Sequence, residues 1–512
     1  MFVKILLLVV FFAVMVAVGV YCKKNATDVN GFVLGGRSVG PWLTAFAYGT
    51  SYFSAVIFVG YAGQFGWKYG IASTWIGLGN AFLGSLLAWV VLGRRTRLMT
   101  QHLETATMPE FFEKRYNSVA LKIVASIIVF VFLIPYTASL YNGLSRLFSM
   151  SFPGIDYSVC VVVMAVLTGI YVIAGGYMAT AINDFIQGII MIIGIVAVIA
   201  AVLMQNGGFI EALNGLAAVE GSVPGTYNSF FGPDPLGLLF VVILTSLGTW
   251  GLPQMVQKFY AIKSEKDINK GTIISTVFAV IVAGGCYFLG GFGRLFTDKL
   301  TFLPDGSIEG GFDAIIPIML SNLPDILIAI VIVLVLSASM STLSSLVLAS
   351  SSTLTLDLIK NHVVKNMSEK KQVFVMRVLI VVFIVISAII AINKDKLSAI
   401  AQMMGISWGA LAGAFLAPFL YGLYLKKSTK ASVWASFIFG AGIMVLNMVC
   451  RNAFPVILQS PINCGVIAML GGLVLVPVVS LFTKKPETAS VEKAFECYDK
   501  AVTVKAKESL GE

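Results

Sequence analysis

The chain has little charge and almost no histidine. Only 12% of its 512 residues are Asp, Glu, Lys or Arg, and two are His, whereas a soluble domain has about 25% charged residues. His102 and His362 lie in basic loops, so no His, carboxylate and nucleophile share an apolar segment. A soluble globular protein is therefore excluded, and an enzyme is disfavoured because such a cluster is what an active site needs.

The cysteines give no indication of a metal site. The six cysteines are scattered, and no pair has the spacing of a metal site. We expect most of them to fill space inside helices.

Hydrophobic residues make up 58% of the chain and recur in runs of roughly 20 residues, which is long enough to cross a bilayer as a helix. The sequence therefore predicts an all-α polytopic protein of the cell (plasma or inner) membrane. The thirteen expected spans are 2–22, 42–67, 71–93, 122–147, 157–178, 182–204, 235–252, 271–296, 325–352, 374–393, 399–424, 432–450 and 462–482.

Basic residues indicate the orientation. The first run has Lys4 before it, Lys23 and Lys24 after it, and no small-residue cleavage site. This pattern predicts a retained helix with its N-terminus outside. Most of the 35 Lys and Arg residues then fall on the cytoplasmic side, which also holds the polar tail 483–512. The net charge of +10 is thus explained by loops beside anionic lipid, without a nucleic-acid partner.

The stretch "GISWG" (405–409) matches the G-x-S-x-G pattern of serine hydrolases. That motif needs a strand–turn–helix elbow and a His partner, and here it lies inside an apolar run. We interpret Gly405 and Gly409 as sites of close helix packing.

Asp184 is the clearest ionisable residue in an apolar segment, "GGYMATAINDFIQGIIM". Intramembrane carboxylates are commonly functional. Asn183 and Asp184 also precede an apolar run, as a helix N-cap does. Both interpretations stay open from these residues alone.

The most unusual stretch is "LSASMSTLSS" (336–345), where hydroxyls crowd an apolar helix. Ala338, Ser341, Thr342 and Ser345 share one helical face, with Ser344 beside Ser341. Such hydroxyls can bond the preceding turn and allow close packing. Alternatively, they provide the oxygens of a weakly held monovalent cation.

Two segments carry helix-breaking residues in mid-run. One is the polar centre of 41–70, around Gly49, Thr50 and Ser51, and the other is "LTSLGTWGLPQ" (244–254). Broken helices at corresponding positions of two halves are typical of inverted-repeat transporters with a midplane site.

Three motifs, in order, carry a family resemblance: "VLGGRSVGPWLTA" (33–45), "AGGYMATAINDFIQGIIM" (174–191) and "ASMSTLSSLVLASSS" (338–352). The chain resembles the sodium:solute symporter family over most of its length, with "GLPQ" similar to pantothenate and monocarboxylate carriers. The resemblance implies a leucine-transporter-like 5+5 inverted repeat. Its parts would be an extra N-terminal helix and loop (1–41), two repeats (42–204 and 235–424), two C-terminal helices (425–482) and a cytoplasmic tail (483–512).

The resemblance also implies ion and solute sites. The family's main sodium site falls on Thr50, Phe53, Ala338, Ser341 and Thr342. A second sodium, which some members bind, would use Asp184, Ser341, Ser344 and Ser345. Solute residues would be Ser51, Tyr52, Ser54, Tyr136, Thr245 and Thr249.

The solute is harder to predict. Proline carriers of the family have an Asp where this chain has Tyr52, although Tyr136 fits them. Sugar carriers have polar side chains in place of Val56 and Ile57. We also expect no Lys or Arg in mid-membrane within the core, which argues against a polyanion.

The sequence therefore predicts sodium-coupled uptake of a small organic solute by alternating access. A monocarboxylate, a pantothenate-like acid or an amino acid is expected. The alternatives are a sodium/proline symporter and a proton-coupled carrier on the same fold. Sodium ions, the solute and the lipid bilayer are the expected partners, without nucleic acid or an obligate protein.

Overall fold

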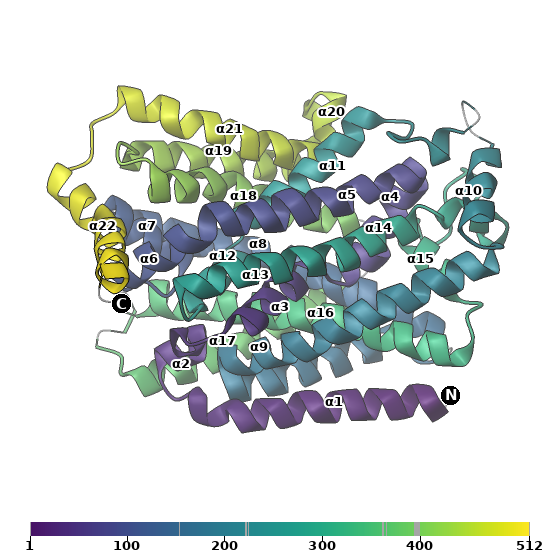
Figure 1. The fold of residues 1–512 in the computed structure, drawn as a ribbon. Helices are drawn as coiled ribbons and strands as arrows, with labels where there is room; N and C mark the ends of the chain where they lie inside the picture. Colours follow the sequence, from purple (N-terminus) through teal and green to yellow (C-terminus); the bar gives the residue numbers. More distant parts are fainter. Residues whose placement is uncertain are drawn as a thin grey trace.

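The structure, a computed structural model, describes residues 2–510 except 153, 221–222, 224, 361–362, 365 and 394–399. His362 lies outside the described residues. Figure 1 shows the long helices side by side, with the N-terminus at one edge and the C-terminal helix at the opposite end. Within the described part, ten helical segments are long and apolar enough to cross a membrane, or eleven if one bent pair counts as a span.

The helices used below have the following bounds: α1 Phe2–Cys22, α3 Pro41–Tyr52, α4 Ala62–Tyr69, α5 Thr74–Gly79, α6 Arg94–His102, α7 Met108–Tyr116, α8 Val119–Ser151, α9 Tyr157–Gln205, α11 Pro235–Leu247, α12 Pro253–Ala261, α13 Glu265–Ala279, α14 Gly285–Gly290, α16 Asp325–Thr353, α17 Glu369–Ile392, α18 Ile400–Tyr424, α19 Lys430–Val449, α21 Pro461–Phe482 and α22 Thr488–Leu510.

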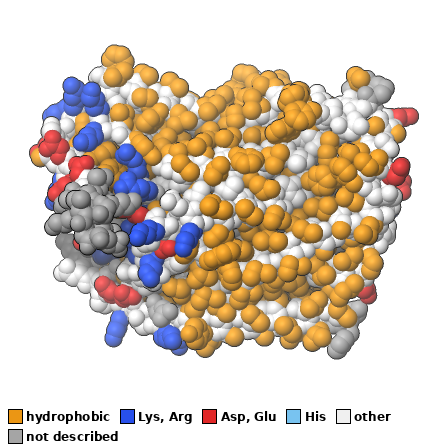
Figure 2. Space-filling view, in the orientation of Figure 1, with side chains coloured by type: hydrophobic (Ala, Val, Ile, Leu, Met, Phe, Trp, Pro, Cys, Tyr) orange, Lys and Arg blue, Asp and Glu red, His pale blue; other side chains and the backbone are white. Residues whose placement is uncertain are grey.

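Burial differs sharply between the centre and the periphery. Every residue of α16 from Leu334 to Thr353 is buried, because α3, α8, α9 and α17 surround it. Peripheral helices such as α1 and α17 expose apolar side chains instead. Figure 2 shows a broad hydrophobic surface on one face of the molecule. In a membrane that surface faces lipid, so α16 is the interior element on which a site can be built.

The first predicted helix break is present. Helix α3 ends at Tyr52, Phe53 is extended (φ −90°, ψ 122°), and the chain resumes as a π-helical segment, Val56–Tyr61, that continues into α4. The last carbonyls of α3 therefore lack following helical N–H groups.

The second predicted break is also present. Helices α11 and α12 are bent by 43° relative to each other. Leu252 between them is extended (φ −86°, ψ 121°), and Pro253 starts α12, where its missing N–H costs nothing.

Two expected pairs of spans are continuous in the structure. Spans 157–178 and 182–204 form the single 49-residue α9, in which Gly176 alone has a non-helical conformation (φ 55°, ψ −147°). Spans 42–67 and 71–93 likewise merge into one helical stretch, Val56–His102. Each joint contains a glycine with positive φ, Gly70 or Gly176, at which the helix is interrupted. Neither joint by itself marks a membrane crossing, so the number thirteen stays a prediction.

The C-terminal tail is helical. Helix α22 returns to the end of the molecule formed by α6 and α7 (Figure 1). The carbonyl of Lys493 lies 2.6 Å from Nε2 of His102, and the Tyr498 hydroxyl donates to the carbonyl of Leu423. Lys and Arg gather at this end in Figure 2.

Candidate cation and solute sites

The first predicted cation site is assembled where the α3 break meets α16. The Ser341 hydroxyl donates to the carbonyls of Thr50 (3.0 Å) and Ala338 (3.1 Å). The Thr342 hydroxyl donates to the same two carbonyls and to that of Phe53 (3.4 Å). All five residues are buried. The structure thus brings together every residue predicted for this site.

The chemistry of this cluster is that of a monovalent cation site. It offers three carbonyl oxygens and two hydroxyl oxygens, and none of its members is a carboxylate. Hard cations prefer oxygen ligands, and divalent ions usually recruit carboxylates. The break supplies the Thr50 and Phe53 carbonyls, and sodium fits this donor set.

Asp184 lies inside α9, eight positions beyond Gly176, and the N-cap of this helix is Asp156. The capping interpretation of Asp184 is therefore excluded. Its side chain is 0% exposed, and its carboxylate oxygens accept no hydrogen bond. Its charged neighbour is Lys258 of α12, whose Nζ lies 3.8 Å from Oδ2.

The expectation of a core without mid-membrane Lys or Arg is wrong. Lys258 is 2% exposed and lies beside Asp184. In the structure, helix α12 starts at Pro253, and Lys258 lies within this helix. Phe259 and Tyr260, which follow it, are buried as well. The apolar run "FYAI" after Lys258 was the available signal.

The second predicted cation site forms around this lysine. Its ammonium donates to the Ser345 hydroxyl at 3.0 Å and lies 5.1 Å from the centre of the Tyr177 ring. The Ser344 hydroxyl donates to the Ser341 carbonyl (2.9 Å). Asp184 and Ser345 thus share one cationic neighbour, and Ser341 faces the first site.

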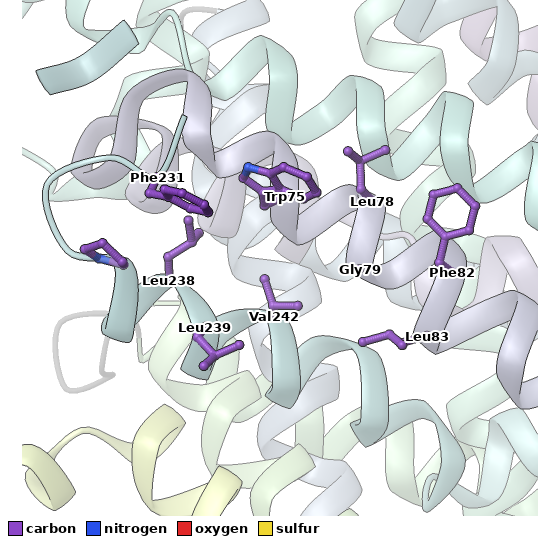
Figure 3. Close-up of a pocket in the computed structure, with 10 residues that line it drawn as sticks. Trp75, Leu78, Gly79, Phe82, Leu83, Phe231, Leu238, Leu239 and Val242 are labelled. Carbon is purple, nitrogen blue, oxygen red and sulfur yellow. The ribbon is translucent and has the colours of Figure 1, made fainter. Parts of the chain in front are cut away.

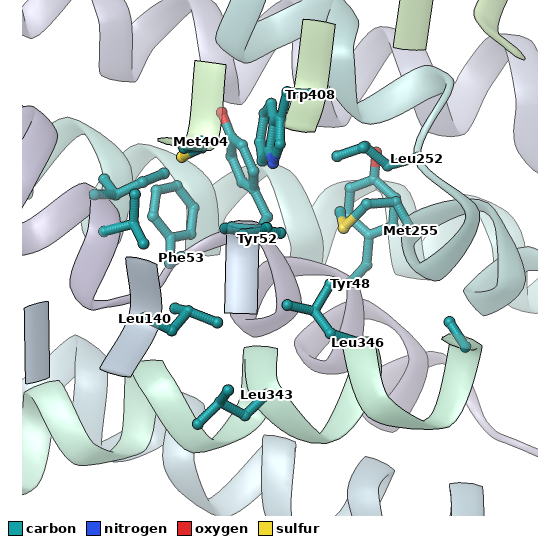
Figure 4. Packing of buried hydrophobic residues seen from close by; sticks show 14 of the residues in the cluster. Tyr48, Tyr52, Phe53, Leu140, Leu252, Met255, Leu343, Leu346, Met404 and Trp408 are labelled. Atoms are coloured by element: carbon teal, nitrogen blue, oxygen red, sulfur yellow. The ribbon is translucent and has the colours of Figure 1, made fainter. Parts of the chain in front are cut away.

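Predicted solute residues gather around a tryptophan. The Tyr52 ring stacks on Trp408 at 5.7 Å, and the Tyr136 ring meets the same indole edge-on at 5.9 Å. Figure 4 shows Tyr52 between Phe53 and Trp408, with Leu252 and Met255 on the side of the second break. The Tyr52 hydroxyl donates to the Thr245 carbonyl (3.1 Å).

Two donors in this cluster, the Tyr136 hydroxyl and the Trp408 indole N–H, are buried without a well-aligned hydrogen bond; they face each other, and the hydroxyl also faces Ser54. Buried polar groups are normally paired, so a polar ligand would satisfy both. Trp408 was not predicted as a site residue, because the stretch "GISWG" was interpreted only through the packing of its two glycines. Those glycines do pack closely, since a Cβ on Gly409 would lie 2.8 Å from Gly465 of α21.

The other solute residues bond within the protein. The Ser51 and Ser345 hydroxyls are 2.7 Å apart, and Ser54 accepts from the N–H of Val56. The Thr249 hydroxyl lies within hydrogen-bond distance of the carbonyls of Gly84 and Ser246.

An apolar groove lies apart from both breaks, between α5 and α11 (Figure 3). Its lining includes Trp75, Phe82, Phe231 and Leu238 and contains no charged side chain. Trp75, Phe82 and Phe231 belong to the exposed apolar surface. The groove therefore lacks the donors that a polar solute requires.

Comparison with known proteins identifies a family. The family model described as "Sodium:solute symporter family" matches residues 32–440. The chain is 28% identical over 486 residues to the osmoregulated proline transporter OpuE of Bacillus subtilis, covering 94% of this chain and 95% of that protein. It is 29% identical over 450 residues to sodium/proline symporters of Staphylococcus aureus, covering 86% and 85%.

A solved structure of a Na⁺-coupled sialic acid symporter has the same fold. It superposes with a TM-score of 0.72 over 95% of this chain and 99% of that one, at 19% identity. This likeness shows the transporter fold and leaves the solute open.

Proposed function

This chain belongs to the sodium:solute symporter family, and on that premise we propose that it drives proline, or another small solute with one carboxylate, into the cell with sodium. It is a multi-pass membrane protein and a transporter, not an enzyme. The observation that carries the sodium proposal is the convergence of the Thr50 and Phe53 carbonyls with the Ser341 and Thr342 hydroxyls. One charge crossing 100 mV releases about 2.3 kcal/mol, enough to accumulate a neutral solute about 40-fold.

Proline is the first solute to test. Relatives that align with nearly the whole chain carry proline in their names. The Tyr52–Trp408 stack offers aromatic faces to a small ring, while Tyr136 and Trp408 offer buried donors to a carboxylate. We propose Ser51, Tyr52, Ser54, Tyr136, Thr245 and Thr249 as solute-site residues, with Trp408 added.

A helix N-terminus also lies close in sequence to the proposed solute residues Tyr52 and Ser54, where it could face the solute's carboxylate. The half-helix that follows the α3 break begins after Ser54, and the N-terminus of a helix favours negative charge. Tyr52, which stands where the resemblance implies an Asp for proline carriers, donates to a backbone carbonyl. This arrangement supports an amino-acid or monocarboxylate solute.

The experiment is uptake into proteoliposomes of radiolabelled proline, pantothenate, short monocarboxylates and sugars. We expect accumulation of one solute under an inward sodium gradient and no accumulation with choline in its place. Uptake driven by a pH gradient in sodium-free buffer would instead establish the proton-coupled alternative. Accumulation of a sugar but of no carboxylate would overturn the solute assignment.

We further propose thirteen membrane crossings in a 5+5 inverted repeat, 42–204 and 235–424, with the N-terminus outside and the tail inside. The 47-residue and 49-residue stretches would measure about 70 Å as straight helices, more than twice the hydrocarbon thickness of about 30 Å. Gly70 (φ 61°, ψ −142°) and Gly176 (φ 55°, ψ −147°) share one helix-interrupting conformation, which supports a division of each stretch there.

Labelling of single cysteines tests this topology. In a background without native cysteines, a cysteine at Glu220 should react with an impermeant maleimide from outside, and one at Lys427 only after permeabilisation. The reverse pattern would overturn the orientation.

A further inference from the structure

The buried pair Lys258–Asp184 lies where the sequence predicts a second sodium ion. Asp184 belongs to α9 and Lys258 to α12, and both side chains are sealed from solvent. We propose that the Lys258 ammonium is the resident cation of this site, so that the carrier moves one sodium ion per solute. This inference rests on the proposed sodium-coupled function and fixes its stoichiometry.

Of the oxygens predicted for the second sodium, the Ser345 hydroxyl oxygen and Asp184 Oδ2 face the ammonium. Lys258 Nζ lies 3.0 Å from the Ser345 hydroxyl oxygen and 3.8 Å from Asp184 Oδ2. The Ser344 hydroxyl donates to the Ser341 carbonyl. The aromatic face of Tyr177, 5.1 Å away, favours an organic cation at the same point.

The balance of charge in this site also argues against a second sodium ion beside Lys258. The carboxylate of Asp184 and the ammonium of Lys258 cancel, so the pair is neutral. A sodium ion added beside them would leave one uncompensated positive charge in a buried site, and such charges are costly inside a membrane protein. The donor set therefore does not fit sodium and lysine together.

A chain of hydrogen bonds also links the ammonium to the first site. Ser345 accepts from Lys258 and lies 2.7 Å from the hydroxyl of Ser51, which is the neighbour of Thr50 on the last turn of α3. The Thr50 carbonyl is a proposed sodium ligand. Lys258 thus connects the inner half of the second broken helix with the end of the first.

The primary test is the ratio of charge to solute in proteoliposomes, measured from the membrane potential at which net flux stops for a known sodium and solute gradient. We expect one sodium ion per solute in the unaltered protein, which is one charge for a zwitterion and none for a monocarboxylate anion. Two sodium ions per solute would overturn the inference while leaving sodium-coupled transport intact. Sodium-independent uptake would instead refute the proposed function itself, so the two failures are distinguishable.

A substitution at Lys258 provides the second test. Lys258→Ala leaves the Asp184 carboxylate unpaired beside the freed Ser345 oxygen, so a second sodium should bind. The Hill coefficient for sodium should rise from about 1 to about 2, both in uptake and in sodium-dependent quenching of tryptophan fluorescence in the purified protein. In the double variant with Asp184→Asn the coefficient should return to about 1.

Lys263→Ala is the matched control, because Lys263 follows α12 closely and its side chain is exposed. Its Hill coefficient should match that of the unaltered protein. A coefficient that stays at about 1 in folded Lys258→Ala protein would overturn the inference. If Lys258→Ala does not fold, the charge ratio of the unaltered protein still decides.

Discussion

The hydroxyl of Ser341 donates to the carbonyl of Thr50 at 3.0 Å, across 291 residues of sequence. This contact joins the end of the first broken helix to the central helix α16. The Thr50 carbonyl, which also accepts from the Thr342 hydroxyl at 3.2 Å, is satisfied by side chains that can also ligate a cation. Sodium affinity should therefore be sensitive to this single oxygen.

Ser341→Ala should raise the half-saturating sodium concentration for uptake by about tenfold or more, since one ligand oxygen is lost and the Thr50 carbonyl loses the shorter of its two hydrogen bonds from hydroxyls. Sodium titrations of initial uptake rates measure the effect. Ser339→Ala is the control, because that hydroxyl donates within its own helix to Val335. Equal sodium dependence in both variants would contradict the assignment of the first site.

Trp408→Leu should raise the KM for the solute by about tenfold, because it removes an aromatic stack and a buried N–H donor. Trp75→Leu, on the apolar groove of Figure 3, should leave the KM unchanged. Solute titrations at saturating sodium measure both. A KM unaffected by Trp408→Leu would place the solute elsewhere.

Gly176→Ala should lower the free energy of unfolding by about 1–3 kcal/mol. The residue has φ +55°, and a Cβ there would lie 2.8 Å from the Phe32 carbonyl oxygen. Gly169→Ala is the control, since its Cβ would meet Ile384 at an ordinary 3.4 Å and alanine favours a helix. Thermal unfolding in detergent compares the two; equal midpoints would show that the Gly176 joint tolerates a side chain.

Asp313, between α14 and α16 in the chain, should make stability depend on pH. Burial raises the pKa of its carboxyl above the ordinary value, against the opposing effects of the Arg146 guanidinium and the Ile400 N–H. A raised folded-state pKa means that the native state binds the proton more tightly. The contribution of this carboxyl is therefore favourable below the ordinary Asp pKa of about 4 and is lost as pH rises through the folded value.

The Tm of the unaltered protein minus that of Asp313→Asn should accordingly decrease as the pH rises above about 4 and through the raised pKa of this carboxyl. Asp305→Asn is a control of opposite sign, because the Ser307 hydroxyl and N–H lower the pKa of that exposed carboxyl. A Tm difference for Asp313→Asn that is constant with pH would show that this carboxyl does not titrate in the expected window.

The sequence by itself determined the local features of this protein, namely its helices, the helix breaks and the residues of the first cation site. Apolar runs predicted the helices, and Gly251 and Pro253 lie at the second break, because a glycine or proline acts on its own backbone wherever it lies. Gly49 lies inside α3, and the first break follows it at Phe53. The five residues of the first cation site were named from motifs, and the structure brings them together. Their convergence depends only on two helices meeting in the way that the family resemblance implies.

Only the tertiary structure decided which polar residues are buried together. Lys258 follows a predicted break and resembles the start of a basic loop, yet α9 and α16 enclose it beside Asp184. Trp408 stood in a stretch read for its glycines, yet its indole faces Tyr52 and Tyr136. Burial and pairing are set by neighbours far away in the sequence, so no local pattern could assign the cation of the second site or the aromatic wall of the solute site.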